Sequence, residues 1–187
     1  PDVNNYLIRV ISELTENYKI DGIHYDYIRY HSIVYGYNKH GLSFFSKLNN
    51  YKIDLLDKDF HRLFLDFKSN SITKFVKRAN IEIKNNLPNC IISAAVKPNI
   101  YDAKLTFYQE WDLWLSAGYI DWAVPMNYIV DNNDFVKNMY MIKNHLPKKY
   151  HDQIVVGIST YNQSARSAGK KINRVRKMQF YNISIFS

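Results

Sequence analysis

A carboxylate at the end of a short β-rich run is the residue of this sequence best placed to do chemistry. Side chains of a strand alternate between its two faces, so in the run DGIHYD, residues 21–26, His24 and Asp26 share one face. Ile23 and Tyr25 share the other face, which we expect to pack against a core. A carboxylate at the rim of the polar face costs free energy unless it is hydrogen-bonded, and it is otherwise kept for a function. Asp26 is therefore the candidate for acid, base or nucleophilic chemistry.

Helical and strand patterns alternate along the chain and would position this carboxylate. Hydrophobic periodicity predicts strands near 19–26, 90–96, 120–128, 154–159 and 181–186. It predicts helices near 3–18, 58–86, 107–117, 135–145 and 165–178. Strands that alternate with helices and are apolar on both faces indicate a parallel sheet with helical crossovers, and hence an α/β fold. Residues 31–58 read as a long loop insertion with a short helix, and long ordered loops are usually functional.

Two architectures fit this alternation, an open doubly wound sheet and a closed barrel. A doubly wound sheet would carry a Gly-rich turn after its first strand, but Gly22 is solitary. A (β/α)8 TIM barrel instead places polar residues at the C-terminal ends of several strands. Such residues lie at four predicted strand ends: Asp26, Lys97, Asn127 with Tyr128, and Tyr161 with Asn162. A complete barrel takes about 250 residues, so we predict that residues 1–187 are a single domain, the C-terminal portion of a barrel that lacks its first three strands.

Several segments resemble, in order, those of one protein family. They are IDGIHYDYIRY, ISAAVKP, YQEWDLWLSAGYIDWAVPMNY and VVGISTY, and they extend over essentially the whole chain. They are similar to segments of the glycosyl-hydrolase-like family 10 proteins, which are bacterial (β/α)8-barrel proteins. The resemblance implies a glycoside hydrolase that acts on a bacterial polysaccharide or cell-wall glycan and is exported. It also places residues 19–26 on the fourth strand of the barrel.

Two other glycosidase patterns bear on the role of Asp26. The segment GIHYD is similar to the fourth-strand pattern of the amylase clan, and this implies a nucleophilic role for Asp26. The same strand also resembles that of the family 18 chitinases, but their catalytic Glu falls on Ile28. Because an isoleucine cannot donate a proton, substrate-assisted chitinase chemistry is not expected.

Glycoside hydrolysis usually needs a second carboxylate. Glu110 is our candidate, since the neighbouring Trp111 would give it an apolar surrounding and raise its pKa toward that of an acid. The alternative is structural, because a carboxylate at the start of a helix is favoured by the helix dipole. The residues expected to bind substrate are His24, Arg29, Tyr30, Lys97, Trp111, Asn127, Tyr128 and Tyr161. No cofactor or metal is expected.

Composition constrains the partners. The chain has 16 tyrosines and 10 phenylalanines, which can line a carbohydrate groove, and a net charge of +8, which favours anionic partners. The basic residues are scattered, so nucleic acid is not an expected partner. No apolar stretch is long enough to span a membrane. The alternative to an enzyme is a non-catalytic carbohydrate-binding barrel that uses the same groove for an oligo- or polysaccharide.

Overall fold

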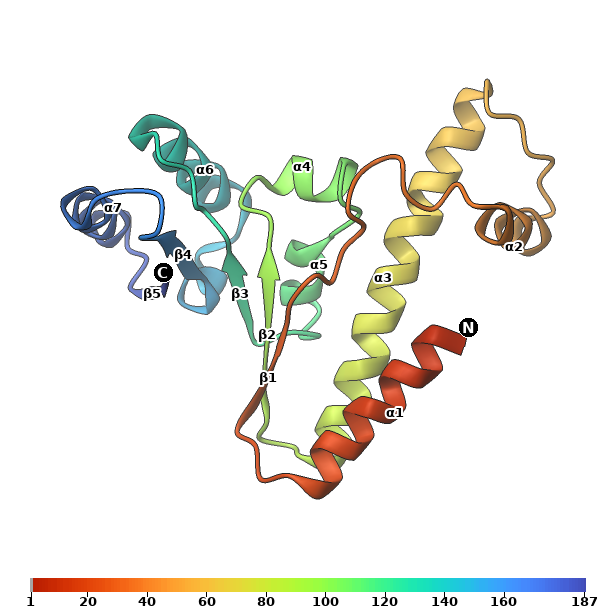
Figure 1. Ribbon diagram of the computed structural model, residues 1–187, viewed down its shortest axis with the longest axis horizontal. Helices are drawn as coiled ribbons and strands as arrows, with labels where there is room; N and C mark the ends of the chain where they lie inside the picture. Colours follow the sequence, from red (N-terminus) through yellow and green to blue (C-terminus); the bar gives the residue numbers. More distant parts are fainter. Residues whose placement is uncertain (1) are drawn as a thin grey trace.

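The computed structural model describes residues 2–187 and confirms an α/β fold built on parallel strands (Figure 1). The strands are β1 Gly22–Tyr25, β2 Ile91–Val96, β3 Trp122–Pro125, β4 Val155–Ser159 and β5 Asn182–Phe186. Parallel pairing joins β1 to β2, β2 to β3, and β4 to β5. Two single parallel bridges, Ala123 to Ile154 and Met126 to Gly157, connect β3 with β4. The strands therefore follow one another in chain order.

Helices separate the strands, as predicted. They are α1 Asp2–Asn17, α2 Lys39–Asn49, α3 Lys58–Asn86, α4 Ile100–Leu105, α5 Trp111–Ser116, α6 Asn132–His145 and α7 Ala165–Lys177, with a 3-10 helix at Lys148–Gln153. The helix predicted near 107–117 corresponds to α5, which begins at Trp111. The preceding α4 was not predicted; Tyr108, between the two helices, has a left-handed φ of 55° that a helix cannot continue through.

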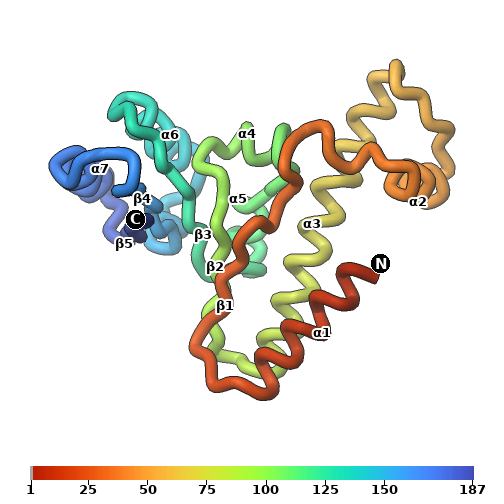
Figure 2. Tube along the Cα trace, viewed as in Figure 1, coloured from red at the N-terminus to blue at the C-terminus, as the bar shows by residue number. Residues whose placement is uncertain are grey.

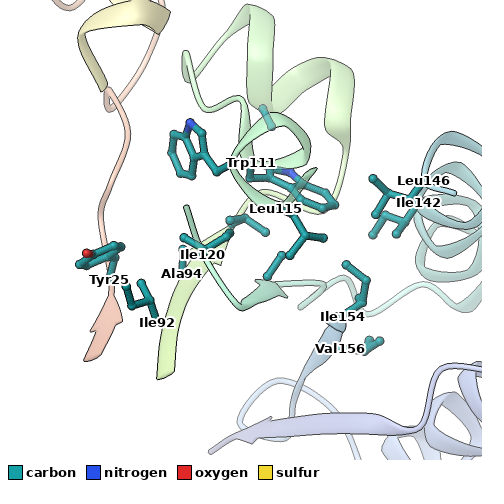
Figure 3. Packing of buried hydrophobic residues seen from close by; sticks show 14 of the residues in the cluster. Tyr25, Ile92, Ala94, Trp111, Leu115, Ile120, Ile142, Leu146, Ile154 and Val156 are labelled. Carbon is teal, nitrogen blue, oxygen red and sulfur yellow. The ribbon is translucent and has the colours of Figure 1, made fainter. Parts of the chain in front are cut away.

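The hydrophobic core lies between the strands and the helices, on one face of the strands (Figure 3). On β2, Ile92, Ala94 and Val96 enter this core together with residues of α1, α3, α4, α5, α6 and α7. Tyr25 of β1 is buried in the same core, whereas His24 is exposed on the other face. The predicted alternation of β1 is thus correct.

The opposite face of the strands carries polar and small side chains. His24 Nδ1 is 2.8 Å from Ser93 Oγ on the neighbouring strand, where the two residues are register partners. Ser93 in turn pairs with Trp122 of β3, whose ring is 44% exposed. We call the face that carries His24 and Ser93 the inner face. It continues to the C-terminal ends of the strands, where Asp26 follows β1.

The predicted insertion at residues 31–58 contains α2 and has a core of its own. Phe45 of α2 packs against Phe60 and Phe64 at the start of α3, and all three rings are fully buried. Figures 1 and 2 show α2 projecting beside the upper end of α3, away from the strands. The insertion is therefore anchored to α3 rather than to the sheet.

A buried lysine fixes the first part of this insertion. Lys68 of α3 is 1% exposed, and its Nζ donates to the carbonyl oxygens of Ile33 and Tyr35 at 3.4 and 3.3 Å and to the hydroxyl of Tyr108. The ammonium lies 3.9 Å from the Tyr108 ring centroid and 4.5 Å from that of Tyr37. Cation–π contacts and carbonyl acceptors together compensate the loss of water around the charge.

Burial of Lys68 makes the stability of the fold depend on pH. Burial lowers the pKa of Lys68 from 10.5 to about 8. Between these values the unfolded chain holds a proton that the folded chain has released, so the free energy of unfolding rises with pH from about 8. Burial also raises the pKa of Tyr108 to about 12, which acts in the opposite direction only above about pH 10.

We expect Lys68→Met to have a flatter stability profile between pH 8 and 10 than the wild type. Lys97 and Lys171 also have pKa values lowered by burial, but they remain in the variant, so the difference between the two profiles isolates Lys68. Urea unfolding at several pH values in this window measures the difference. Parallel profiles for the two proteins would contradict a buried, titrating Lys68.

Candidate active site

Asp26 directly follows β1, and a tight turn holds its carboxylate. The backbone N–H of Tyr27 donates to Asp26 Oδ1 at 2.7 Å, while the side chain of Asp26 stays 63% exposed. Tyr27 has a φ of 54°, in the left-handed region that is uncommon for a residue other than glycine. Strained backbone of this kind clusters at functional sites, where the surrounding structure maintains it. The turn presents Asp26 to the open, inner face.

Arg29 is the cation nearest to this carboxylate. Its Nη1 lies 4.0 Å from Asp26 Oδ1, and its guanidinium carbon is 4.3 Å from the centroid of the Tyr27 ring. The side chain is only 9% exposed, and the buried Nη1 has no hydrogen-bond partner among residues 2–187. The structure thus places the Arg29 guanidinium beside the Asp26 carboxylate.

A buried glutamine links the loops that carry the two cations of the site, Arg29 and Lys97. Gln109 is 1% exposed; its Oε1 accepts from the backbone N–H of Lys97 at 2.8 Å. Its Nε2 donates to the carbonyl oxygens of Ile28 and Ala95 at 3.3 and 3.2 Å. Sequence reasoning missed Gln109, because its only visible signal was its place next to Glu110. It connects the end of β2 to the turn that follows Asp26.

Lys97, at the end of β2, is half-buried beside this link. Its Nζ lies 4.1 Å from the centroid of the Phe107 ring. Burial lowers the pKa of Lys97, the nearby charge of Arg29 lowers it further, and Asp102 acts in the opposite direction. The structure brings Lys97 to the site, but the cation paired with Asp26 is Arg29.

Three aromatic rings form a wall at the other end of the strand edge. The rings of Tyr128 and Phe186 are stacked, with centroids 5.3 Å apart and an interplanar angle of 13°. Tyr161 meets Phe186 edge-on at 5.8 Å, and its side chain is 61% exposed. The pKa of Tyr128 is raised by burial first, and then by the charges of Tyr161 and Asp26. Phe186 belongs to the wall and was not among the predicted site residues.

Several predicted substrate contacts are not at the site. Asn127 is fully buried; its Nδ2 donates to the Phe135 carbonyl at 2.9 Å, and its Oδ1 accepts from Asn138. It therefore faces α6, because the strand alternation turns Tyr128 inward and its neighbour outward. Trp111 is also fully buried, and its indole N–H donates to the Lys97 carbonyl at 3.0 Å. The predictions that Asn127 and Trp111 contact substrate are wrong for these reasons.

Tyr30 and His24 occupy different positions relative to Asp26. The Tyr30 ring packs edge-on against Tyr108, 5.2 Å away, so it supports the insertion rather than the carboxylate. His24 is on the same inner face as Asp26 but lower along β1, where it contacts Ser93. Of the two, only His24 faces the space in front of the strands.

Glu110 has a partner that sequence reasoning did not anticipate. Its Oε1 is 2.9 Å from Lys104 Nζ of α4, and its side chain is 15% exposed. The hydrogen bond to Glu110 raises the pKa of Lys104, so this lysine stays charged and paired. The expectation of an apolar surrounding for Glu110 is wrong, since the ammonium of Lys104 lies against its carboxylate. Asp112, nearby, pairs with His145 at 2.8 Å on the helical side.

The remaining titratable groups define no metal site in the part of the chain that the structure describes. Within residues 2–187, no three His, Cys, Asp or Glu side chains lie close enough together to hold a metal ion. The arrangement at the strand ends is therefore a carboxylate, a buried arginine, a lysine and an aromatic wall. Such a set can bind a polar ring compound and place one carboxylate against it.

Comparisons with known proteins show the family and the fold of the chain. The sequence profile of a family described as glycosyl hydrolase-like 10 matches residues 1–175. The fold is similar to that of the PgaB (BpsB) glycoside hydrolase domain from Bordetella bronchiseptica, with a TM-score of 0.80 at 9% sequence identity. The similarity covers 100% of this chain and 57% of that domain chain. No curated protein gave a significant sequence match.

Proposed function

Because the chain belongs to the glycosyl hydrolase-like 10 family, we propose that it is a glycoside hydrolase that cleaves glycosidic bonds in a bacterial polysaccharide or cell-wall glycan. The observation that carries the proposal is the position of Asp26. Its carboxylate is exposed on the inner face, fixed by the Tyr27 N–H at 2.7 Å and accompanied by Arg29. Most glycoside hydrolases use a pair of carboxylates that flank the scissile bond, and Asp26 is suited to be one of them.

We propose that the five strands formed by residues 2–187 are part of a (β/α)8 barrel, as a single domain with α2 in an insertion after β1. Three features support this. The strands are parallel and follow chain order, whereas a doubly wound sheet reverses its order. The helices share one core on one face of the strands. The similar hydrolase domain is longer than this chain, which covers 57% of it.

In this proposal Asp26 acts as the nucleophile or as the equivalent base. Arg29 lies 4.0 Å from the carboxylate, and the Tyr27 N–H fixes one carboxylate oxygen. His24 and Lys97 contribute polar contacts, and Tyr128 and Tyr161 offer aromatic surface to a sugar ring. The proton for the leaving oxygen comes from a second acid. Glu110 would take that role only after release from Lys104.

The ion pair between Glu110 and Lys104 also favours the alternative function, a non-catalytic carbohydrate-binding barrel. Such a protein would use the same groove without breaking a bond. The two functions are separated by incubating the full-length protein with bacterial polysaccharides and measuring both binding and new reducing ends. Bound glycan with new reducing ends supports the hydrolase. Bound glycan that stays intact supports the alternative.

A polysaccharide or cell-wall substrate lies outside the cytoplasm, so we propose that the protein is exported, as its family resemblance implies. None of the helices within residues 2–187 is long and apolar enough to cross a membrane.

Tyr161 offers a direct test of the aromatic wall. We expect Tyr161→Ala to weaken glycan binding about 5- to 10-fold, because a stacking ring contributes on the order of 1 kcal/mol. Stability should change little, since the ring is 61% exposed. Isothermal titration with the bound glycan measures the loss. Tyr140→Ala on α6, a similarly exposed tyrosine outside the wall, is the matched control, and equal effects of the two changes would contradict the assignment.

A further inference from the structure

Helix α7 carries a row of positive charge along its exposed side. Residues three or four apart lie on one side of a helix, so Arg166, Lys170, Arg174 and Lys177 form a single stripe, and all four are exposed. The stripe extends over about 16 Å at the rise of an α-helix. The helix contains no acidic residue, and none of the four cations makes an ion pair in the described part of the chain.

This stripe forms one wall of a groove between α6 and α7. Figures 1 and 2 show the two helices side by side, at the end of the molecule that is remote from α1 and α2. The groove has a volume of about 360 Å³, and Lys170, Arg174 and Lys177 line it from α7. Asn132 and Asn133 line it from α6. Within residues 2–187 no carboxylate contributes to its walls, so the groove is cationic.

The charged groups next to the groove do not change this balance. Asp131 is the N-cap of α6, and its Oδ1 accepts from the backbone N–H of Asn133 at 2.8 Å. The end of α6 is therefore already capped and is not itself an anion site. Lys171 also lines the groove, but it is buried, and its Nζ donates to the Val130 carbonyl at 2.9 Å and to Gln163 Oε1 at 2.8 Å. The groups left to bind a ligand are the exposed cations and the asparagine amides.

The shape and lining of the groove indicate the kind of anion. A row of cations along a groove fits a linear polyanion better than a single charged group. A flat membrane surface cannot enter a groove, and the apolar side of α7, with Ala168 and Val175, is buried in the core and is not available to lipid. Among residues 2–187, no aromatic side chain lines the groove, so it lacks the stacking platforms of single-stranded nucleic acid sites.

Amides on both walls favour phosphate over carboxylate groups. Asn132 and Asn133 of α6 and Asn173 of α7 make no side-chain hydrogen bond within residues 2–187, so their amide N–H groups are available to a ligand. A tetrahedral phosphate group directs oxygens towards both walls, where amides and cations can donate to them. A carboxylate has only two oxygens, which lie in one plane.

We propose that the groove between α6 and α7 binds a linear polymer that carries phosphate groups. The groove shares no residue with the proposed active site, so this second site goes beyond the proposed function. It also lies between two helices that pack on the outer side of the strands, whereas Asp26 faces the inner side. Both sites can therefore be occupied at the same time.

Inorganic polyphosphate, a linear polyanion without sugars or bases, is the probe. Isothermal titration of the full-length protein at several salt concentrations should show binding whose association constant falls with salt, with a log–log slope of about 3, because each of the four cations contributes about 0.7–0.9. Polyglutamate of matched charge should bind about 10-fold more weakly, the loss expected for one charge-assisted hydrogen bond. No binding of polyphosphate, or equal or tighter binding of polyglutamate or oligothymidylate, would overturn the assignment.

Matched variants separate the groove from the net charge of the protein. Lys170→Gln should lower the slope by about one, and Lys170→Gln/Arg174→Gln/Lys177→Gln should leave a slope of about 1. Arg176→Gln removes the same charge from the same helix, but Arg176 does not line the groove, so the slope should stay unchanged. All four side chains are exposed, so thermal unfolding should change little. Equal losses in Lys170→Gln and Arg176→Gln would show that net charge attracts the polymer, and would contradict the proposal.

The outcome is independent of the proposed hydrolase. Tyr161→Ala, in the aromatic wall, should leave polyphosphate binding unchanged, because Tyr161 does not line the groove. Polyphosphate binding that is lost in this variant would contradict a separate site. If no glycan is cleaved but polyphosphate binding depends on Lys170, the hydrolase fails and the groove stands. If glycans are cleaved and polyphosphate does not bind, the groove fails and the hydrolase stands.

Discussion

Replacing Asp26 with asparagine is expected to lower glycoside hydrolysis by roughly 10²–10⁴-fold, the range for loss of a positioned acid–base group. Asparagine keeps the size of the side chain and can still accept the Tyr27 N–H, but it carries no charge and cannot attack or take a proton. The free energy of unfolding should change by no more than about 0.5 kcal/mol, because the side chain is 63% exposed. Glycan binding should remain close to that of the wild type.

Asp21 provides the matched control for this substitution. It lies just before β1, at the end opposite to Asp26 and on the other parity of the strand, so its carboxylate is remote from the inner rim. Asp21→Asn should therefore leave hydrolysis unchanged within about a factor of two. Equal losses in both variants would show that the effect comes from general destabilisation and not from the chemistry of Asp26.

The second large effect is expected at Gln109. Gln109→Leu fills a similar volume but leaves the Lys97 N–H and the carbonyls of Ile28 and Ala95 without their side-chain partner. We expect the free energy of unfolding to fall by about 3–5 kcal/mol, since each unsatisfied buried group costs about 1–3 kcal/mol. Hydrolysis should also fall about 10²-fold, because the turn that positions Asp26 is no longer tied to β2.

Urea unfolding and initial hydrolysis rates, measured on the same preparation, separate these two effects. Gln153→Leu is the control, because the Gln153 side chain makes no hydrogen bond within residues 2–187 and the residue lies in the distant 3-10 helix. A stable Gln109→Leu protein with wild-type rates would show that the glutamine does not position the loops.

Hydrophobic periodicity predicted the helices and strands of this fold well, because it depends only on residues that are close together in the sequence. The long amphipathic run predicted a helix near 58–86, and α3 has these bounds. Alternation in residues 21–26 placed Tyr25 in the core and His24 on the inner face, and both predictions are correct. The short helix α4 and the left-handed turn at Tyr108 were not predicted, because the conformation of Tyr108 depends on its burial and its contact with Lys68, which join distant parts of the chain.

The site was predicted less completely, for a related reason. Strand-end position identified Asp26, Lys97 and Tyr128, but it could not decide whether Asn127 or Tyr128 points inward, because parity is uncertain where a strand ends. The partners of Gln109 and Glu110 come from other loops, and no spacing in the sequence indicates them. The contacts between loops are therefore known only from the structure.

The central claim is that Asp26 is the reacting carboxylate of a glycoside hydrolase. The most direct test is the rate at which the wild type and Asp26→Asn release new reducing ends from one glycan that both proteins bind. We predict steady release by the wild type and a rate at least about 10²-fold lower for the variant, with unchanged affinity. Equal rates for the two proteins would contradict the role of Asp26, and no release by a wild type that binds the glycan would contradict the enzyme.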